Sequence, residues 1–318
     1  MEAFWSPSKK RGTSVAKGAH FLRQDVSRFD ASFFGLPKHD ADAMDPQHRI
    51  MMEVAYEALE AAGLPLDQIA GSRTGVFIGY LTNDYQDRIC RDLDDAPMYT
   101  FTGTSTASLA NRISWLWDLR GPSFTINTAC SSSLLALHLA CESLQRGESD
   151  IAVVGGSNLL LNPEMFIFLS SQGFLSPDGK CKTFDESANG YGRGEGFGCV
   201  ILKRVNEAVA AGDPIRAVIR GTGSNQNGRT KGLTMPNAEA QRALIEEVYQ
   251  EAGLDFGMTG YIEAHVCPSN LFLALRSPII SASILTYLGR VPVRRLVIGK
   301  KCKRWQGLSQ HLILQKTN

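Results

Sequence analysis

The chain has 318 residues, 43% of them hydrophobic, which is enough to bury a substantial core in one large domain or two small ones. Its 33 basic and 32 acidic side chains nearly balance, without the basic excess typical of nucleic-acid-binding proteins. No apolar run is long enough to span a membrane, so we expect neither nucleic acid nor a membrane as a partner. The seven cysteines form no CxxC pair, which argues against a zinc site, and the lack of a signal peptide favours the reducing cytoplasm.

Helices and strands are predicted to alternate along the chain. Residues 1–19 are polar and basic, and we expect them to form a disordered or frayed N-terminus. Apolar residues at helical spacing predict helices over 45–63, 107–117, 134–147, 206–211 and 238–252. Short apolar or β-branched runs predict strands over 75–79, 124–127, 151–156, 199–202, 215–223 and 261–265. Strand, helix and strand at this spacing are typical of a parallel α/β layer.

Cys130 falls at the tight step between the predicted buried strand 124–127 and the helix that follows it. Its sulfur should lie near the first free N–H groups of that helix, which favour a thiolate over a thiol. This is the geometry of a nucleophile elbow built with Cys in place of Ser. Most free cysteines are simply small buried hydrophobes, but the strand-turn-helix frame favours a nucleophile here. Residues 131–133 are serines, and we interpret them as ordinary N-cap and first-turn residues.

A glycine-rich stretch covers residues 190–198 and alternates Gly with larger residues. It does not join a strand to a helix at the spacing of a nucleotide-binding loop, so we interpret it as close backbone packing near a ligand path. His48 is expected on a helix surface or in a local salt-bridge network, and His138 in the core beside its helix. His265 ends the last predicted strand, a position in which a lone histidine is more often structural than catalytic.

Six short motifs occur along the chain in a set order. They are Asp45-Pro46-Gln47-His48-Arg49, Thr128-Ala129-Cys130-Ser131-Ser132-Ser133, Lys182-Thr183-Phe184-Asp185, Gly192-Arg193-Gly194-Glu195-Gly196, Asn225-Gln226-Asn227-Gly228-Arg229-Thr230 and Tyr261-Ile262-Glu263-Ala264-His265. Their order and spacing resemble a β-ketoacyl synthase, in the style of the ketosynthase domain of a type I polyketide synthase. The resemblance covers residues 20–265. It implies a thiolase-like layered α/β fold (αβαβα) and a homodimer in the parent enzyme, with the strand before the nucleophile at the interface.

The resemblance also implies the chemistry. Cys130 matches the nucleophile that takes an acyl chain from the phosphopantetheine arm of an acyl carrier protein. His265 matches the first of two histidines that promote decarboxylation of the malonyl thioester and stabilise the enolate that attacks the acyl-cysteine. A thiolate makes a reactive thioester, and imidazole donors beside a developing oxyanion lower the barrier of such a decarboxylative Claisen condensation. No directly bound cofactor or metal is expected, because the carrier protein holds the substrates.

The resemblance is incomplete at both ends. The opening strand of the type Ile-Ala-Ile-Val-Gly-Met-Gly is missing before Asp25, and nothing after His265 continues the family pattern or supplies the second histidine. Residues 266–318 are therefore interpreted as a non-homologous tail that packs poorly. The codons permitted at Val266-Cys267 and Arg290 are compatible with a retained intron followed by a frameshift. We expect the first strand and most of the C-terminal half of the fold to be absent.

Three functions remain open at this point. The leading one is an incomplete ketosynthase domain of polyketide or fatty-acid-like biosynthesis, in which Cys130 is acylated but condensation is very weak or absent. The alternative is a non-catalytic ketosynthase remnant that dimerises or binds acyl carrier protein. A third is a hydrolase with a dyad of Cys130 and His265, against which the other four motifs argue. The starter unit, chain length and product depend on pocket shape and on domains outside this sequence.

Overall fold

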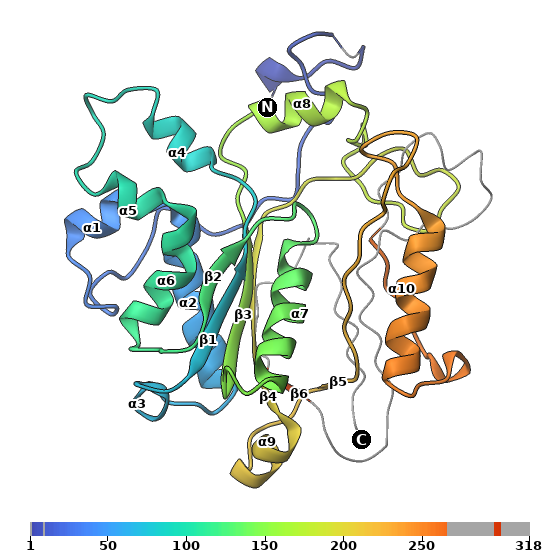
Figure 1. Ribbon diagram of the computed structural model, residues 1–318. Helices are drawn as coiled ribbons and strands as arrows, with labels where there is room; N and C mark the ends of the chain where they lie inside the picture. The colour runs from blue at the N-terminus through green and yellow to red at the C-terminus, as the bar shows by residue number, and fades with distance from the viewer. Residues whose placement is uncertain (1, 9, 266–295, 300–318) are drawn as a thin grey trace.

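The computed structural model describes residues 2–8, 10–265 and 296–299, the last four by their backbone (Figure 1). Its strands are β1 (Thr74–Gly79), β2 (Ser123–Ile126), β3 (Ile151–Asn158), β4 (Gly196–Arg204), β5 (Val218–Ile219) and β6 (Leu296–Gly299). They form a six-stranded sheet in the order β2-β1-β3-β4-β6-β5. β1 pairs in parallel with β2 and β3, whereas the pairs from β3 to β5 across the sheet are antiparallel.

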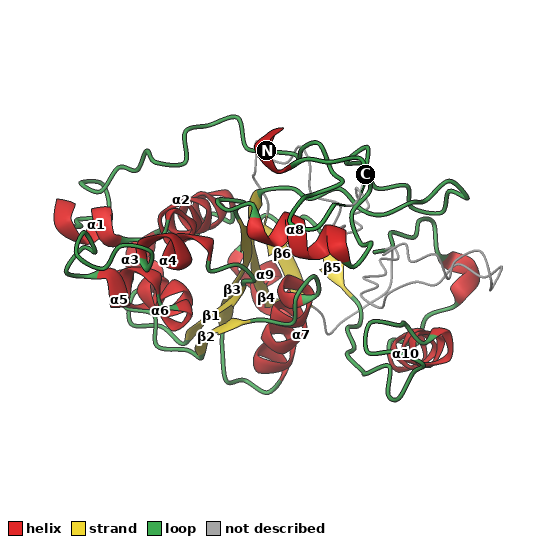
Figure 2. Ribbon diagram, turned by 90° about the horizontal axis from the view of Figure 1, so that it is seen from above, coloured by secondary structure: helices red, strands yellow, loops and turns green. Residues whose placement is uncertain are grey.

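Helices cover both faces of this sheet. They are α1 (Lys38–Ala43), α2 (Pro46–Ala61), α3 (Leu66–Ile69), α4 (Asp84–Ile89), α5 (Thr100–Thr104), α6 (Thr106–Leu116), α7 (Ser132–Gln145), α8 (Glu164–Ser171), α9 (Val205–Ala211) and α10 (Ala238–Glu251), with short 3-10 helices η1 (Glu2–Phe4) and η2 (Phe256–Met258). Figures 1 and 2 show α2 and α6 on one face of the sheet and α7 on the other. None of the helices in the described residues is long and apolar enough to cross a membrane.

Successive side chains of β1 point to opposite faces of the sheet and contribute to two separate layers of the core. Val76 and Ile78 belong to the apolar cluster on the side of α2 and α6, together with Met51 of α2. Phe77 points the other way and packs in the cluster formed with α7, which includes Leu137. Successive side chains of a strand point to opposite faces, so one strand can serve both layers. A sheet buried on both faces confirms the predicted α/β class.

The helix start at Asp45 is confirmed in detail. Asp45 is the N-cap of α2, and its carboxylate accepts the backbone N–H of Gln47 at 2.7 Å. Pro46 occupies the first position of the helix, where its missing N–H costs nothing. The predicted helix near 238–252 likewise has a side-chain cap, because the Asn237 amide oxygen accepts the N–H of Glu239 at 3.1 Å. Residues adjacent in sequence make both caps, which is why the sequence could predict them.

Three strand predictions need correction. β2 was expected to be buried, but it is the edge strand of the sheet, and Phe124 on it is 39% exposed. The strand predicted over 215–223 contracts to the two residues of β5. In the segment 261–265 the structure has no strand, only a backbone bridge at His265. A strand needs a neighbouring strand to pair its backbone groups, and the sequence of one segment does not show whether that neighbour exists.

The N-terminal segment is also better ordered than predicted. Ser14, Val15 and Ala16 are buried, and the two apolar residues pack in a small cluster with Phe166 of α8. The hydroxyl of Ser170 accepts the backbone N–H of Val15 at 3.1 Å. In Figure 1 this segment lies against α8. The expectation of a frayed terminus is wrong for residues 14–16, because two small apolar residues inside a polar run find a distant partner.

Four residues of the predicted tail lie in the sheet. β6 pairs with β4, where Ile201 stands opposite Gly299, and with β5, where Val218 stands opposite Val297. This pairing satisfies backbone groups that β4 and β5 would otherwise present at an open edge. The sequence did not predict any element there. The other residues of the predicted tail lie outside the described part of the chain.

Candidate active site

Cys130 lies in the turn between β2 and α7, as predicted for a nucleophile elbow. The turn is tight: Ala129 has φ 55°, and the backbones of Thr128 and Cys130 form a bridge. A positive φ is uncommon for a residue with a Cβ atom, and such strain is kept where the surrounding structure demands a sharp reversal. The chain therefore leaves the sheet and enters the helix within a few residues, with Cys130 at the point of reversal.

The two serines after Cys130 hold this turn together. The Ser132 hydroxyl accepts the N–H of Thr128 at 2.9 Å and donates to the carbonyl of Ala129 at 2.6 Å. The Ser131 hydroxyl donates to the carbonyl of Thr128 at 2.9 Å. Ser131 is the N-cap residue of α7 but makes no capping hydrogen bond. These serines thus occupy the predicted N-cap and first-turn positions of α7, but their hydroxyls bond backward to the elbow and do not cap the helix.

The start of α7 sits directly on the sheet. A Cβ atom added to Gly79, the last residue of β1, would lie 2.4 Å from the backbone nitrogen of Ser133. Only glycine permits that approach. It brings the first turn of α7, and with it Cys130, to the carboxyl end of the parallel strands. In open α/β sheets ligands bind outside the carboxyl ends of the strands, so Cys130 lies at the expected position of a substrate-binding site.

The electrostatic environment of Cys130 differs from the prediction. The residue is reached by solvent, but the protein packed around its sulfur disfavours the charged form, and this desolvation raises the pKa of the Cys130 thiol. A backbone hydrogen bond and the Arg193 guanidinium act in the opposite direction and lower that pKa. The net direction is upward. The prediction that the helix N-terminus favours a thiolate is therefore wrong in its net result, because desolvation outweighs the favourable groups.

The glycine-rich stretch 190–198 supplies two charged side chains that sequence reasoning missed. Glu195 is 8% exposed, and its carboxylate accepts the N–H of Leu22 at 2.9 Å and that of Leu160 at 3.0 Å. Glu195 therefore joins the N-terminal segment to the chain beyond β3. Arg193 is 7% exposed and acts on Cys130. One feature of the sequence could have identified them: Arg193 and Glu195 are the two charged residues in a stretch otherwise made of glycines and aromatic residues.

His265 lies at the end of the described segment that follows α10, and it is half-buried. Within that segment the Tyr261 hydroxyl donates to the Glu263 carboxylate at 2.7 Å. The pairing of His265 with Cys130 stays a prediction. His138 lies on α7, where its Nδ1 is 2.9 Å from the hydroxyl of Thr222, so it ties the helix to the segment after β5.

The first motif holds two buried ionisable groups, Asp45 and His48, three positions apart in sequence. His48 is 1% exposed, so the expectation of a surface position is wrong, and neither ring nitrogen has a hydrogen-bond partner among the described residues. Burial, aided by the charge of Arg112, lowers the pKa of His48 to about 3. Asp45 is fully buried, and burial raises its pKa to about 6 although the N–H of Gln47 and the hydroxyl of Tyr80 act against this.

These two pKa values predict opposite effects on stability. The ordinary pKa of His48 is 6.5. Below that pH the unfolded chain binds a proton at His48 that the folded chain does not bind, so the free energy of unfolding falls with acidification. Asp45 has an ordinary pKa of 3.8, so between about 6 and 3.8 the folded chain binds the proton first, and stability rises with acidification. Each group changes the free energy of unfolding by about 1.4 kcal/mol per pH unit, and the two changes offset each other between about pH 3.8 and 6, where both groups contribute.

Single variants should separate the two slopes. We expect His48→Gln to become less stable as pH rises from about 4 to 6, and Asp45→Asn, which keeps an oxygen for the cap, to become more stable over the same range. Urea unfolding at several pH values measures both profiles against the wild-type chain. Parallel pH profiles in the two variants would show that these groups do not control the acid stability.

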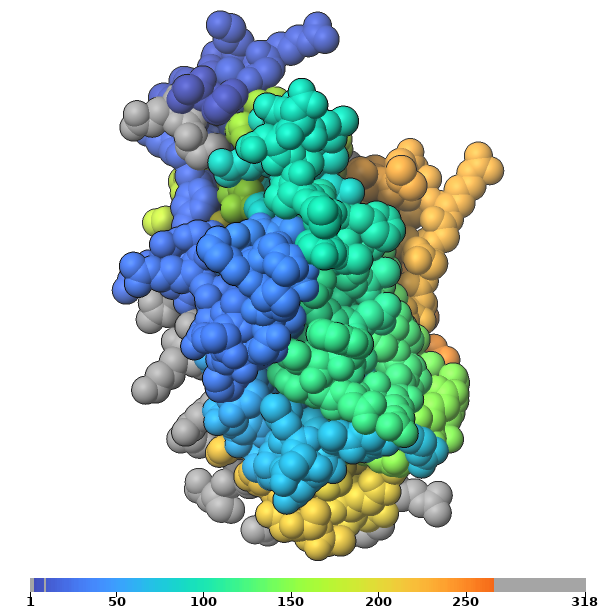
Figure 3. Space-filling view, turned by 90° about the vertical axis from the view of Figure 1, so that its left-hand side faces the viewer, coloured from blue at the N-terminus to red at the C-terminus, as the bar shows by residue number. Residues whose placement is uncertain are grey.

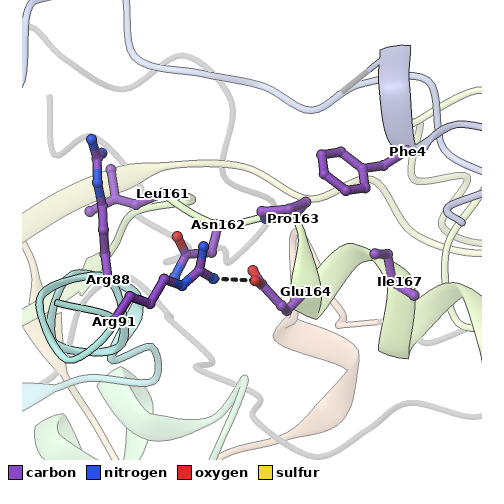
Figure 4. Close-up of a pocket in the computed structure, with 8 residues that line it drawn as sticks. All are labelled: Phe4, Arg88, Arg91, Leu161, Asn162, Pro163, Glu164 and Ile167. Atoms are coloured by element: carbon purple, nitrogen blue, oxygen red, sulfur yellow. Dashed lines mark hydrogen bonds and ion pairs between the residues drawn. The ribbon is translucent and has the colours of Figure 1, made fainter. Parts of the chain in front are cut away.

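A separate cavity of about 380 Å³ lies between the N-terminal segment, α4 and the start of α8 (Figure 4). Its lining residues are Phe4, Arg88, Arg91, Leu161, Asn162, Pro163, Glu164 and Ile167. Arg91 and Glu164 form an ion pair across it. Neither Cys130 nor His265 lines this cavity, so its chemistry is not that of the elbow.

A cysteine elbow at the carboxyl end of a mixed α/β sheet, in a chain that carries the six ordered motifs, is the arrangement expected of a protein with the thiolase-like fold. The chain belongs to the β-ketoacyl synthase family: the model of the N-terminal domain, "Beta-ketoacyl synthase, N-terminal domain", matches residues 2–208, and that of the C-terminal domain matches residues 216–271. The match thus begins at residue 2, whereas the sequence motifs had placed its start near residue 20.

Its curated relatives are fungal polyketide synthases. The chain is 86% identical over 265 residues to the highly reducing polyketide synthase dmxL2 of Cryptosporiopsis sp., a match that covers 83% of this chain and 11% of that protein. It is 57% identical over 257 residues to a highly reducing polyketide synthase of Didymella fabae, covering 81% of this chain and 14% of the relative. The chain therefore spans only about a tenth of the length of these proteins.

Solved ketosynthase structures share the fold. The oxazolomycin ketosynthase domain OzmH KS7 of Streptomyces albus superposes with a TM-score of 0.77 at 40% identity, over 83% of this chain and 46% of that one. The ketosynthase from module 6 of the bacillaene synthase of Bacillus subtilis gives 0.72 at 38% identity, over 80% and 42%. The fold is thus thiolase-like, and the matched part amounts to less than half of either solved chain, as expected of a partial domain.

Proposed function

We propose that the chain carries the acyl-accepting part of a ketosynthase reaction. The Cys130 sulfur attacks the thioester carbonyl of an acyl chain held on acyl carrier protein, an acyl-cysteine forms, and the phosphopantetheine thiol leaves with the proton that Cys130 gave up. The complete reaction would continue with a malonyl thioester, which loses carbon dioxide and joins its enolate carbon to the acyl group. The observation that carries this proposal is the elbow geometry of Cys130 in a chain of this family.

Within this proposal the second half of the reaction is impaired. His265 would bind and polarise the malonyl thioester carbonyl, but the family uses two histidines for decarboxylation, and the one histidine beyond residue 265, His311, lacks the Gly-His context of the second. Oxyanion stabilisation typically contributes a factor of about 10²–10³ per donor, so loss of one donor set weakens condensation severely. Cytoplasmic location and the absence of a directly bound cofactor belong to the same proposal.

Condensation should therefore be very weak or absent in the purified chain. The assay supplies an acyl thioester and malonyl-acyl carrier protein and measures the β-ketoacyl product by mass spectrometry. A matched chimera replaces residues 266–318 with the remainder of the dmxL2 ketosynthase, and we expect it to restore condensation because the missing groups return. Clear product from the unaltered chain would refute the impairment, and a folded chimera without product would refute the proposed ketosynthase activity.

The alternative is a non-catalytic remnant that dimerises or binds acyl carrier protein, and one observation favours it. Residues 80–116, which form the middle and upper part of the surface in Figure 3, carry several exposed apolar side chains. They are Leu93 (72%), Met98 (88%), Phe101 (82%) and Trp115 (71%). Together with the open edge of β2, these side chains support a homodimer, because exposed apolar surface is stabilised by burial against a partner.

A further inference from the structure

The elbow places backbone strain next to the nucleophile. Ala129, the residue immediately before Cys130, has φ 55°. This left-handed conformation suits glycine, and asparagine or aspartate can stabilise it through their side chains, but alanine has neither advantage. Such strain persists only where surrounding groups hold the residue in place. The conformation of Ala129 therefore depends on the groups that bond to the backbone around it.

The buried hydroxyl of Ser132 bonds to the backbone on both sides of the strained residue. It accepts the N–H of Thr128 at 2.9 Å and donates to the carbonyl of Ala129 at 2.6 Å. Ser132 is only 4% exposed, so water does not readily replace either bond. A hydroxyl has one proton to donate, and here that proton goes to Ala129. Ser132 thus connects Ala129 to the first turn of α7.

The sheet in turn fixes the position of Ser132. A Cβ atom on Gly79 of β1 would lie 2.7 Å from the Ser132 carbonyl carbon, and one on Gly156 of β3 would lie 2.9 Å from the Cβ of Ser133. Gly79 and Gly156 stand opposite each other in the parallel pair of β1 and β3. The first turn of α7 therefore rests on two neighbouring strands, and Ser132 is a fixed point against which Ala129 is held.

The hydrogen bond to the Ala129 carbonyl bears directly on Cys130. That carbonyl belongs to the peptide unit that joins Ala129 to Cys130, and a peptide unit is planar, so its orientation fixes the position of the Cys130 Cα. If Ala129 relaxed to a negative φ, this unit would rotate and the sulfur would move with it. A misplacement of about 1 Å can slow an enzymatic step about 10²-fold.

The other polar side chains of the turn restrain Ala129 less. The Ser131 hydroxyl donates to the carbonyl of Thr128 at 2.9 Å, so it acts on the preceding residue. The Asn127 side-chain oxygen accepts the N–H of Ala129 at 3.1 Å, but Asn127 is exposed. Hydrogen bonds of exposed groups compete with water and hold the backbone less firmly. Ser132 therefore provides the buried restraint on Ala129.

We propose that Ser132 is a positioning residue: its hydroxyl holds Ala129 in the left-handed conformation and thereby places the Cys130 sulfur for attack on an acyl thioester. This inference rests on the proposed function, in which Cys130 accepts the acyl chain. Ser132 acts through the backbone, because its proton is donated to the Ala129 carbonyl. Loss of the hydroxyl should therefore slow acylation by more than any loss of overall stability explains.

The test is the rate at which the full chain forms its acyl adduct with an acyl-pantetheine thioester, followed by intact-mass spectrometry. Ser132→Ala removes the hydroxyl and should slow adduct formation about 10- to 100-fold. Ser143→Ala is the matched control, because Ser143 lies on the same helix and is 3% exposed, but its hydroxyl pairs with that of Ser149 at 2.8 Å, at the other end of α7. This control should lose stability in urea unfolding and keep the wild-type rate.

Two further measurements separate positioning from general stabilisation. Ala129→Gly, added to Ser132→Ala, should recover most of the lost rate, because glycine adopts a positive φ without strain. Amide hydrogen exchange over residues 127–133, read by peptide mass spectrometry, reports on the turn itself. It should be at least about tenfold faster in Ser132→Ala, because the N–H of Thr128 loses its acceptor and the turn opens more often.

Several outcomes would overturn the inference. They are an unchanged adduct rate in a folded Ser132→Ala chain, an equal loss in Ser143→Ala, and a double variant that recovers nothing. If Ser132→Ala does not fold, Asn127→Ala removes the exposed bond to Ala129, and an unchanged rate in that variant would also overturn it. The proposed function is scored separately: faster exchange of the turn in Ser132→Ala, in a chain whose wild type accepts no acyl group, would uphold the restraint on Ala129 and reject the proposed function.

Discussion

Replacement of Cys130 by alanine is expected to abolish the acyl adduct that the chain forms with an acyl thioester. Alanine removes the sulfur that forms the covalent bond, and no neighbouring hydroxyl can take its place, because Ser131 and Ser132 donate their protons to the carbonyls of Thr128 and Ala129. The rate of adduct formation should fall by at least about 10³-fold. Intact-mass spectrometry after incubation with an acyl-pantetheine thioester measures the adduct.

The control for this experiment is another accessible thiol. Cys181 is exposed, as Cys130 is, so Cys181→Ala should retain the full adduct while Cys130→Ala loses it. Peptide mapping then locates the acyl group. An adduct that survives in Cys130→Ala would show that the elbow is not the acceptor. A folded wild-type chain without any adduct would favour the non-catalytic remnant.

Replacement of Gly190 by alanine is expected to destabilise the chain by about 3 kcal/mol or more. Gly190 has φ 137°, a conformation that residues with a Cβ atom rarely adopt. The added Cβ would also lie 2.2 Å from the backbone nitrogen of Ser176 and 2.3 Å from the carbonyl carbon of Leu175. Backbone atoms on a neighbouring segment cannot move aside as a flexible side chain could. Urea unfolding measures the loss in free energy.

Gly173 offers a matched control for the backbone strain. It also has a positive φ, 76°, but a Cβ atom there would meet nothing within 4 Å. Gly173→Ala should therefore cost only about 1 kcal/mol, the strain of the conformation without the clash. The difference between the two variants isolates the close packing of the glycine-rich stretch. Equal losses in both would refute the interpretation of that stretch as a site of close backbone contact.

The amino-acid sequence was sufficient for the features that depend on neighbours along the chain. The cap at Asp45, the helix periodicity and the strand-turn-helix frame around Cys130 all involve residues a few positions apart, and the structure confirms them. The family resemblance rested on the same kind of local motif. Such features could be predicted because their geometry is decided by short-range bonding and by the spacing of apolar residues.

Tertiary structure decided whatever depends on residues distant in sequence. It made β2 an edge strand, buried Val15 against Phe166, and shortened the predicted strand 215–223 to β5. It also decided the ionisation of Cys130. Desolvation by the surrounding protein raises the pKa of this thiol, and the charge of Arg193, which is distant in sequence, lowers it. Burial, strand pairing and electrostatic contacts arise only when segments distant in sequence pack together, so the local sequence pattern of one segment does not predict them.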